Sequence, residues 1–268
     1  MTSFPLPTLP LVHDDPEALA LAAAAGVHGV YVANALHRAE GAGLLLQQRG
    51  AAAGLCWFGA RGNLVVIAPD LDPAAVAAAI QVSRLPFRLA MGPAGVVDAL
   101  AQLCTRPPLV LRDQCYYRAT PADAAPDLIS DAVRPAQRGD RDRLAQATLL
   151  LNQSDLNIDP RRVDRRWLRD TIDERIADGS TRVLGDVGAF SGKLDFGSEG
   201  PAGQVIEGVF TFPQVRGQGT AGRLVASCIA AAGQPVCLHV GEHNQPARRA
   251  YERAGMTAVD RCRLLLIG

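Results

Sequence analysis

The sequence has no excess charge of either sign, few aromatic residues and almost no lysine. Its 268 residues carry 27 Lys and Arg against 27 Asp and Glu, and aromatic residues make up 5% of the chain. Because a basic field supplies much of the affinity of proteins for DNA and RNA, the balanced charge argues against a nucleic-acid partner. Lys193 is the only lysine. This bias is typical of high-GC coding, so arginine-rich stretches carry little functional information.

The six cysteines include no Cys-x-x-Cys pair and have no histidine at zinc-finger distance. This pattern predicts no metal site, and a chain of this length does not need disulfides. We therefore expect the cysteines to be small core residues in a reducing compartment. Cys115, which precedes two tyrosines, is expected to pack in the core and not to act as a nucleophile.

The N-terminus lacks the basic and then apolar regions of a secretory signal, and no run of residues suits a membrane. The stretch 18–36 is mostly Ala and Gly and contains His28 and Asn34, so its transfer into lipid is unfavourable. We expect a cytoplasmic protein with no membrane or nucleic-acid partner, existing as a monomer or homodimer.

Apolar sequence is abundant, since hydrophobic residues make up 48% of the chain, enough for a sizeable core. The length favours two domains, and the stretch 119–131, with two prolines and repeated Ala and Asp, is the best linker. We predict a division into residues 1–125 and 126–268. Both halves are expected to be α+β and to follow the order α, α, β, β, α, β, α, β, which suggests a duplication.

Periodicity and turn residues predict the elements of each half. In the first half we expect helices at 16–25, 32–48, 73–82 and 95–104, and strands at 53–58, 64–68, 87–91 and 109–117. In the second half we expect helices at 140–152, 164–177, 220–232 and 246–253, and strands at 132–135, 181–190, 204–212, 235–240 and 258–267, with a glycine-rich loop at 192–203. Helix 164–177 interleaves arginines with acids, which favours a solvated face.

The most informative segment is 205–232, in which an apolar strand leads through Pro213 to glycines at 217, 219 and 222 and then to a helix. Glycines let backbone amides approach a bulky anion, and a helix start adds free N–H donors, so the segment predicts a phosphate or pyrophosphate cradle. The loop has no Gly-Lys-Ser/Thr, which excludes a P-loop. A dinucleotide fingerprint also fits, with Glu242 placed 20 residues beyond Gly222. Only 46 residues follow Gly222, however, too few for the rest of a doubly wound sheet.

Two motifs in this half resemble those of the GNAT acyltransferases. The segment Arg216-Gly-Gln-Gly-Thr-Ala221 is similar to the family's Gln/Arg-x-x-Gly-x-Gly/Ala loop. Beginning 28 residues later, Asn244-Gln-Pro-Ala-Arg-Arg-Ala-Tyr251 resembles its Asn-x-x-Ala-x-x-x-Tyr, followed by Gly255-Met256 where the family has Gly-Phe. The resemblance covers about residues 132–268, and the whole chain resembles a bacterial two-domain subgroup with an uncharacterised N-terminal domain.

The resemblance implies a GNAT fold with a mixed central sheet that binds an acyl-CoA. Two parallel strands would splay apart, with the pantetheine between them along Val209, Phe210 and Thr211. Asn244 and Arg248 would touch the far side of the cofactor, although Asn244 is also suited to cap its helix. The pyrophosphate would lie on the glycine loop, whose residues are Arg216, Gly217, Gln218, Gly219, Thr220, Ala221 and Gly222.

The resemblance also implies that an amine attacks the thioester directly while Tyr251 donates a proton to the departing thiolate, a role that suits a phenol. Glu207 on the preceding strand is a candidate base acting through water, or an outward surface residue. Asp155 and Asp159 are expected in the loop after the first helix of this half, where the family lines its acceptor site. They are candidates to bind a cationic amine, or to cap the loop.

We therefore expect an acyl-CoA-dependent N-acetyltransferase that transfers acetyl from acetyl-CoA to a primary amine of a small molecule or peptide, without a metal. The alternatives are a non-catalytic acyl-CoA-binding or sensing module in which Tyr251 is a core residue, and an NAD(P)-binding protein. The run His239-Val-Gly-Glu-His243 spells a zinc-protease signature, but a strand keeps its histidines too far apart to share one ion.

Only twelve residues follow Met256, whereas many GNAT domains finish with a two-stranded hairpin. The N-terminal half is a candidate to supply the missing edge. Its strand, Gly92-Pro93 and helix resemble a phosphate loop that has lost the glycine motif, so we expect a degenerate, non-catalytic GNAT-like copy.

Overall fold

The fold is seen in a computed structural model that describes residues 6–11, 13 and 15–268. Residues 1–5, which belong to the segment where we expect no secretory signal, lie outside the described part. By their contacts, the residues form two compact units. Unit 1 comprises residues 1–116, 198–203 and 260–268, and unit 2 comprises residues 117–197 and 204–259. The predicted division at residue 125 stays a prediction.

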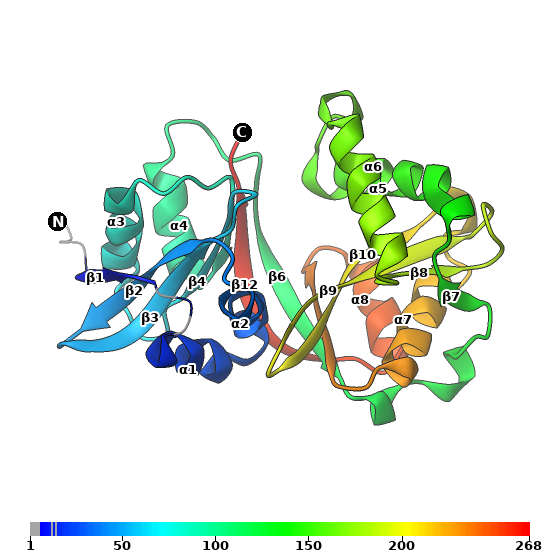
Figure 1. Cartoon of the computed structure of the whole chain (residues 1–268), viewed down its shortest axis with the longest axis horizontal. Helices are drawn as coiled ribbons and strands as arrows, with labels where there is room; N and C mark the ends of the chain where they lie inside the picture. Colours follow the sequence, from blue (N-terminus) through cyan, green and yellow to red (C-terminus); the bar gives the residue numbers. More distant parts are fainter. Residues whose placement is uncertain (1–5, 12, 14) are drawn as a thin grey trace. The chain divides into compact units, whose positions relative to one another are not determined.

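Both halves of the chain follow one order of elements, β-α-α-β-β-β-α-β-α-β (Figure 1). The first half contains β1 (Thr8–Pro10), α1 (Pro16–Ala24), α2 (Val30–His37), β2 (Ala42–Gln48), β3 (Ala51–Phe58), β4 (Asn63–Ile67), α3 (Pro73–Ser83), β5 (Leu89–Gly92), α4 (Ala94–Leu103) and β6 (Val110–Ala119). The second contains β7 (Val133–Pro135), α5 (Arg141–Leu156), α6 (Arg165–Ala177), β8 (Thr181–Leu184), β9 (Gly192–Gly200), β10 (Gly203–Thr211), α7 (Thr220–Ala231), β11 (Val236–Gly241), α8 (Gln245–Arg253) and β12 (Thr257–Leu266).

The predicted strand 181–190 ends at Leu184, and two further predicted elements are wrong. The segment 32–48 is helical only as far as His37 and then forms strand β2, because Leu45 and Leu46 face two different cores, as successive residues of a strand do. The segment 192–203 begins with strand β9 and is not a loop. Lys193 and Asp195 are each only 4% exposed, and buried charges of this kind hide the apolar pattern that normally indicates a strand.

Unit 1 has the sheet order β1-β2-β3-β4-β5-β12-β6. Its strands alternate their side chains between two cores, so that Leu55 and Val65 pack with α1 and α2, whereas Cys56 and Val66 pack with α3 and α4. Figure 1 shows these helix pairs on the two faces of the sheet. Strands β4 and β5 are parallel and are connected through α3. Burial of each large apolar side chain stabilises the unit by about 1.5–3 kcal/mol.

Unit 2 has the sheet order β6-β11-β10-β9-β8-β7. One core lies against α5 and α6 and includes Phe190, Phe210 and Phe212, with ring centroids of the last two 5.2 Å apart. Strands β10 and β11 are parallel and are connected through α7. The end of β6 lies beside β11, so the N-terminal half of the sequence does supply an edge to this unit. In unit 1, β12 likewise pairs with β5.

All six cysteines are free thiols, and five of them are buried, as the sequence predicts for core residues. Cys115 is 3% exposed. Burial raises the pKa of Cys237 to about 11 and that of Cys228 to about 12, so these thiols stay protonated and unreactive. In the described residues, no helix has both the length and the apolar character needed to cross a bilayer.

Gly255, which joins α8 to β12, is held by a close approach to the turn at Asp123. Its φ is +107°, and a Cβ there would lie 1.8 Å from the Asp123 carbonyl oxygen. Gly255→Ala is expected to lower the free energy of unfolding by about 3 kcal/mol or more, from strain and overpacking together. Gly179→Ala, with φ +69° and open space, should cost only about 1–2 kcal/mol. Urea unfolding measures both, and equal losses would contradict the packing argument.

Candidate functional site

The turn between β10 and α7 is open and is shaped by two glycines. Gly217 and Gly219 each have φ of +80°, and a Cβ at either position would meet no atom within 4 Å. The backbone conformation, and not crowding, therefore requires glycine at both positions. The four residues from Arg216 to Gly219 are exposed. The Arg216 side chain folds back, and its Nε donates to the Thr211 carbonyl oxygen at 3.2 Å.

The first turn of α7 has amides that no side chain caps, because its N-cap residue is Gly219. In unit 1 the corresponding helix between two parallel strands is α3, and its N-cap residue is Asp72. The Asp72 carboxylate accepts the Ala75 N–H at 2.9 Å, and Asp70 precedes it. A helix start with free N–H donors attracts an anion. Unit 2 offers such a start, whereas in unit 1 the Asp72 carboxylate accepts a hydrogen bond from the first turn of α3.

This comparison corrects the expected position of the degenerate loop in the first half. The segment Gly92-Pro93 leads from β5 into α4, whereas the crossover that matches β10, α7 and β11 is β4, α3 and β5. The turn equivalent to the glycine turn is therefore 68–72, which contains no glycine.

The strand that leads into the turn presents an unpaired edge near its end. The parallel register of the described residues joins β10 and β11 only at Gln204 with Val236 and at Val205 with Cys237. Phe210 turns its carbonyl oxygen toward β9, since a Cβ at Gly192 would lie 2.7 Å from it. Neighbouring residues of a strand point their backbone groups to opposite edges. The backbone groups of Val209 and Thr211 therefore point to the side of β11, beyond the last paired residue.

The two predicted cofactor contacts on α8 already have partners in the protein. Asn244 caps α8, because its Oδ1 accepts the Ala247 N–H at 3.2 Å. Arg248 Nε donates to the Tyr117 hydroxyl at 3.0 Å, and that hydroxyl donates to Glu252 Oε1 at 2.7 Å. The capping role of Asn244 is thus observed, and contacts of either residue with a cofactor stay predictions.

Tyr251 lies on α8 in a buried position, 6% exposed, with its ring edge-on to that of Tyr117 at 6.2 Å. Burial, and next the negative charge of Asp155, raise its pKa well above the ordinary value of a phenol. The hydroxyl makes no hydrogen bond to any described residue. Tyr251 is therefore a protonated phenol.

The two predicted acceptor residues differ in what they do. Asp155 does not follow the helix but lies in the last turn of α5, where the helix dipole disfavours a carboxylate. Its charge nevertheless acts on Tyr251. Asp159 caps a short 3₁₀ turn, accepts the Arg161 N–H at 2.9 Å and pairs with the Arg161 side chain at 3.0 Å. These bonds hold the pKa of Asp159 below its usual range.

Glu207 lies on β10, just before Gly208, which has φ of +59°. Its Oε1 accepts from Arg175 Nη2 at 2.7 Å, and the side chain is 34% exposed. Sequence analysis missed Arg175, Lys193 and Asp195, which form a charged cluster behind Glu207. The signal available was Lys193, a single lysine in a chain that otherwise uses arginine.

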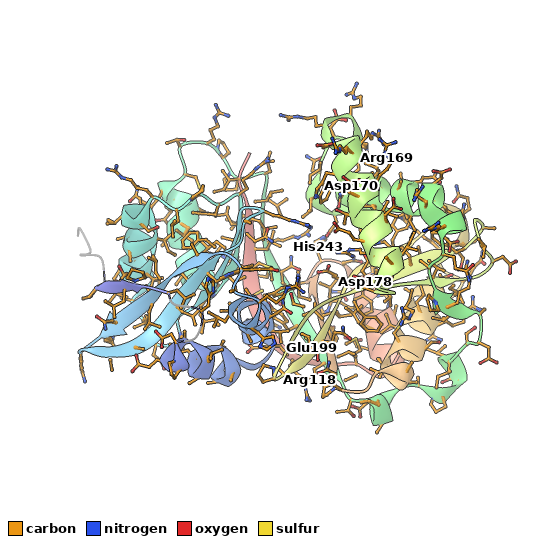
Figure 2. The ribbon with its side chains drawn as sticks, in the orientation of Figure 1. Arg118, Arg169, Asp170, Asp178, Glu199 and His243 are labelled. Carbon is orange, nitrogen blue, oxygen red and sulfur yellow. The ribbon has the colours of Figure 1, made fainter. Side chains whose placement is uncertain are left out.

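The arginine-rich helix α6 has the solvated face that its charge pattern predicts. Figure 2 labels Arg169 and Asp170 on this helix, and both are exposed. Arg166 and Asp170 form an ion pair at 3.8 Å. His239 lies on strand β11, as expected, and the described residues contain no group of three or more His, Cys, Asp or Glu suited to a metal ion.

Comparisons with known proteins agree with this geometry. The model of the family described as FR47-like protein matches residues 197–265. No curated protein is similar enough to the sequence to match it. A GNAT-family acetyltransferase from Colwellia psychrerythraea has a TM-score of 0.55 and 12% identity, over 98% of this chain and 100% of that chain. A GCN5-related N-acetyltransferase from Sphaerobacter thermophilus has a TM-score of 0.55 and 19% identity, over 98% and 96%.

A tandem GNAT protein from the clavulanic acid biosynthesis pathway has a TM-score of 0.50 and 14% identity, over 97% of each chain. These likenesses cover both halves of the sequence. The chain therefore has the GNAT fold, and the resemblance carried by the motifs at Arg216–Ala221 and Asn244–Tyr251 is confirmed.

Replacement of a turn glycine tests whether the turn binds an anion. Gly219→Ala should weaken acetyl-CoA binding about tenfold or more, because strain of about 1–2 kcal/mol displaces the amides from their positions. Gly50→Ala is the matched control, since Gly50 has φ of +81° and equally open space but lies between β2 and β3. Calorimetry with acetyl-CoA should show unchanged affinity for the control, and equal affinities for both variants would contradict the assignment.

Proposed function

We propose that the protein is an acyl-CoA-dependent N-acyltransferase that transfers an acetyl group to a primary amine. The single observation that carries the proposal is the exposed turn before α7, where two left-handed glycines leave the first amides of the helix without a side-chain cap, after a strand whose described pairing with β11 ends early. A pyrophosphate fits such donors. The GNAT fold adds support, since the solved structures that share it include acetyltransferases.

In this proposal, the amides from Gly217 to Gly222 bind the pyrophosphate of acetyl-CoA. The pantetheine amides pair with the backbone groups of Val209 and Thr211, next to Phe210, and Arg216 gives up its bond to the Thr211 carbonyl oxygen. Asn244 and Arg248 approach the cofactor from α8, and Arg248 then exchanges its bond to Tyr117 for one to the ligand. This backbone pairing positions the thioester, so the side chains that take part in the reaction do not have to hold it.

The reaction needs a proton donor for sulfur and a route for protons leaving nitrogen. The ammonium form of the acceptor loses a proton to water held by Glu207, and the neutral nitrogen then attacks the thioester carbonyl carbon. The C–S bond breaks as the C–N bond forms, and Tyr251 protonates the thiolate. The nitrogen loses its second proton to solvent, and Tyr251 regains one. The net change is one ammonium and one thioester giving an amide, a thiol and H⁺.

The negative charge of Asp155 close to Tyr251 favours an amine substrate that carries a positive charge. Asp155 is exposed, and its charge reaches the Tyr251 hydroxyl, so an ammonium drawn to Asp155 lies near the proton donor. Asp159 is bound to Arg161 and contributes less. The acceptor is thus a small molecule or peptide that presents a primary amine, and neither a metal nor a nucleic acid takes part.

Replacement of Tyr251 separates catalysis from binding alone. Tyr251→Phe should lower kcat by about a hundredfold or more, because a general acid contributes at least that much, while the Kd for CoA stays unchanged. The neighbouring Tyr117→Phe should cost about 1 kcal/mol of stability and leave kcat within a few fold. Unchanged turnover in Tyr251→Phe would rule out the proton-donor role. CoA binding without turnover in the native chain would instead favour the sensing module.

Replacement of Asp155 tests the cationic acceptor. With cadaverine as the amine, Asp155→Asn should raise the KM for the amine three- to tenfold, which is the size of one charged contact of about 1 kcal/mol. The KM for acetyl-CoA should not change. Asp170→Asn on the solvated face of α6 is the control. An equal KM for cadaverine in the two variants would refute the role.

A further inference from the structure

A chain of four alternating charges runs from the interior of unit 2 to Glu207. Lys193 pairs with Asp195, Asp195 Oδ2 lies 2.5 Å from Arg175 Nη1, and Arg175 Nη2 lies 2.7 Å from Glu207 Oε1. Thr181 donates to the other Asp195 oxygen at 2.6 Å. Arg175 therefore uses one arm of its guanidinium on each carboxylate. This fork geometry belongs to arginine and not to lysine.

The inner pair of this chain is costly to bury. Lys193 and Asp195 are each 4% exposed, and removal of two charges from water costs several kcal/mol per ion before their attraction offsets it. Burial alone raises the pKa of Asp195, but the charges of Lys193 and Arg175 outweigh it and hold the pKa below its ordinary value. Well-packed apolar residues often stabilise such a position as well or better. Stability alone therefore does not account for the pair.

Two glycines make room for the cluster beside the strand that leads to the glycine turn. A Cβ at Gly208 would lie 2.7 Å from Asp195 Oδ2 and 2.8 Å from Lys193 Nζ. A Cβ at Gly197 would lie 2.8 Å from the Glu207 carboxyl carbon. Strand β10 thus packs directly against the buried pair at Gly208, and Glu207 occupies the space that Gly197 leaves open.

Glu207 is consequently held at one oxygen and open at the other. Oε1 is bound by Arg175, and Oε2 accepts no hydrogen bond from any described residue. We propose that Arg175 is a positioning residue, anchored by the buried Lys193–Asp195 pair, which aims the free oxygen of Glu207 at the acceptor amine or at the water that relays its proton. This inference rests on the proposed acetyltransferase function.

The arrangement also defines how Glu207 meets its partner. Its open oxygen accepts a hydrogen bond from the amine N–H or from the relaying water, while Arg175 holds the other oxygen. The negative charge that faces the amine is fixed in place before the amine arrives, which lowers the cost of ordering it.

A double-mutant cycle tests whether Arg175 acts through Glu207. With acetyl-CoA and cadaverine, Arg175→Gln should lower kcat/KM for the amine ten- to a hundredfold, and Glu207→Gln at least as much. The double variant should be no slower than Glu207→Gln, because residues that act as a unit are not additive. Arg175→Lys should recover little, since one ammonium does not bridge both carboxylates. Equal losses from Arg175→Gln in both backgrounds would overturn the proposal.

Two further variants separate positioning from stability. The pair replacement K193M/D195L should keep the melting temperature near that of the native chain and reproduce the loss seen in Arg175→Gln. Arg141→Gln removes an ion pair with Asp173, at 2.6 Å between α5 and α6, without touching the cluster, and should leave the kinetics unchanged. If K193M/D195L keeps native kcat/KM, the anchor role is refuted.

Calorimetry and crystals distinguish failure of this inference from failure of the proposed function. Native affinity for acetyl-CoA should persist in every variant, and no uptake by the native chain would refute the acetyltransferase itself. Crystals of Arg175→Gln should then show the Glu207 carboxylate displaced from its place over Gly197. A carboxylate that stays in place without Arg175 would refute the positioning role whatever the acceptor.

Discussion

The parallel pairing of β10 with β11 ends after two residues, and the proposed chemistry depends on that early end. Beyond Val205 and Cys237 the backbone of β10 has an edge without a strand partner, and the chain then turns through two glycines into a helix start without a cap. A continuous ladder would satisfy these groups within the protein. Because it stops, unit 2 has backbone donors and acceptors for a ligand, and the side chains only refine what the backbone offers.

The two halves place different residues at the start of the helix in one shared arrangement of strands and helix. Both have a parallel crossover through a helix. In unit 1 the N-cap residue of the helix is Asp72, whose carboxylate accepts the Ala75 N–H. In unit 2 the N-cap residue is Gly219, which has no side chain to cap the helix. A carboxylate repels an anion from the same donors that glycine leaves free. One residue type at the N-cap thus separates a closed helix start from an open one.

Much of the fold, including the open glycine turn before α7 and the cap at Asn244, could be predicted from the sequence, because glycines with a helix start and the Asn244–Tyr251 motif are local patterns. Strand β2 was missed because its three leucines, Leu44 to Leu46, extend a helical pattern. Strand β9 was missed because Lys193 and Asp195 are charged but buried, and no local rule distinguishes that from a solvated loop. The role of Arg175 depends on contacts with residues 20 and 32 positions away, which only the folded chain brings together.

The exchange of strands between the halves has a consequence for biogenesis. Unit 1 includes β12, whose Leu264 pairs with Met91 of β5, more than 170 positions earlier in the chain. During synthesis, the place beside β5 in this sheet therefore stays empty until residues 257–266 have left the ribosome. Such a late, distant pairing slows maturation and leaves an exposed edge in the interval. The chain therefore folds as a whole, because neither half of the sequence contains every strand of its unit.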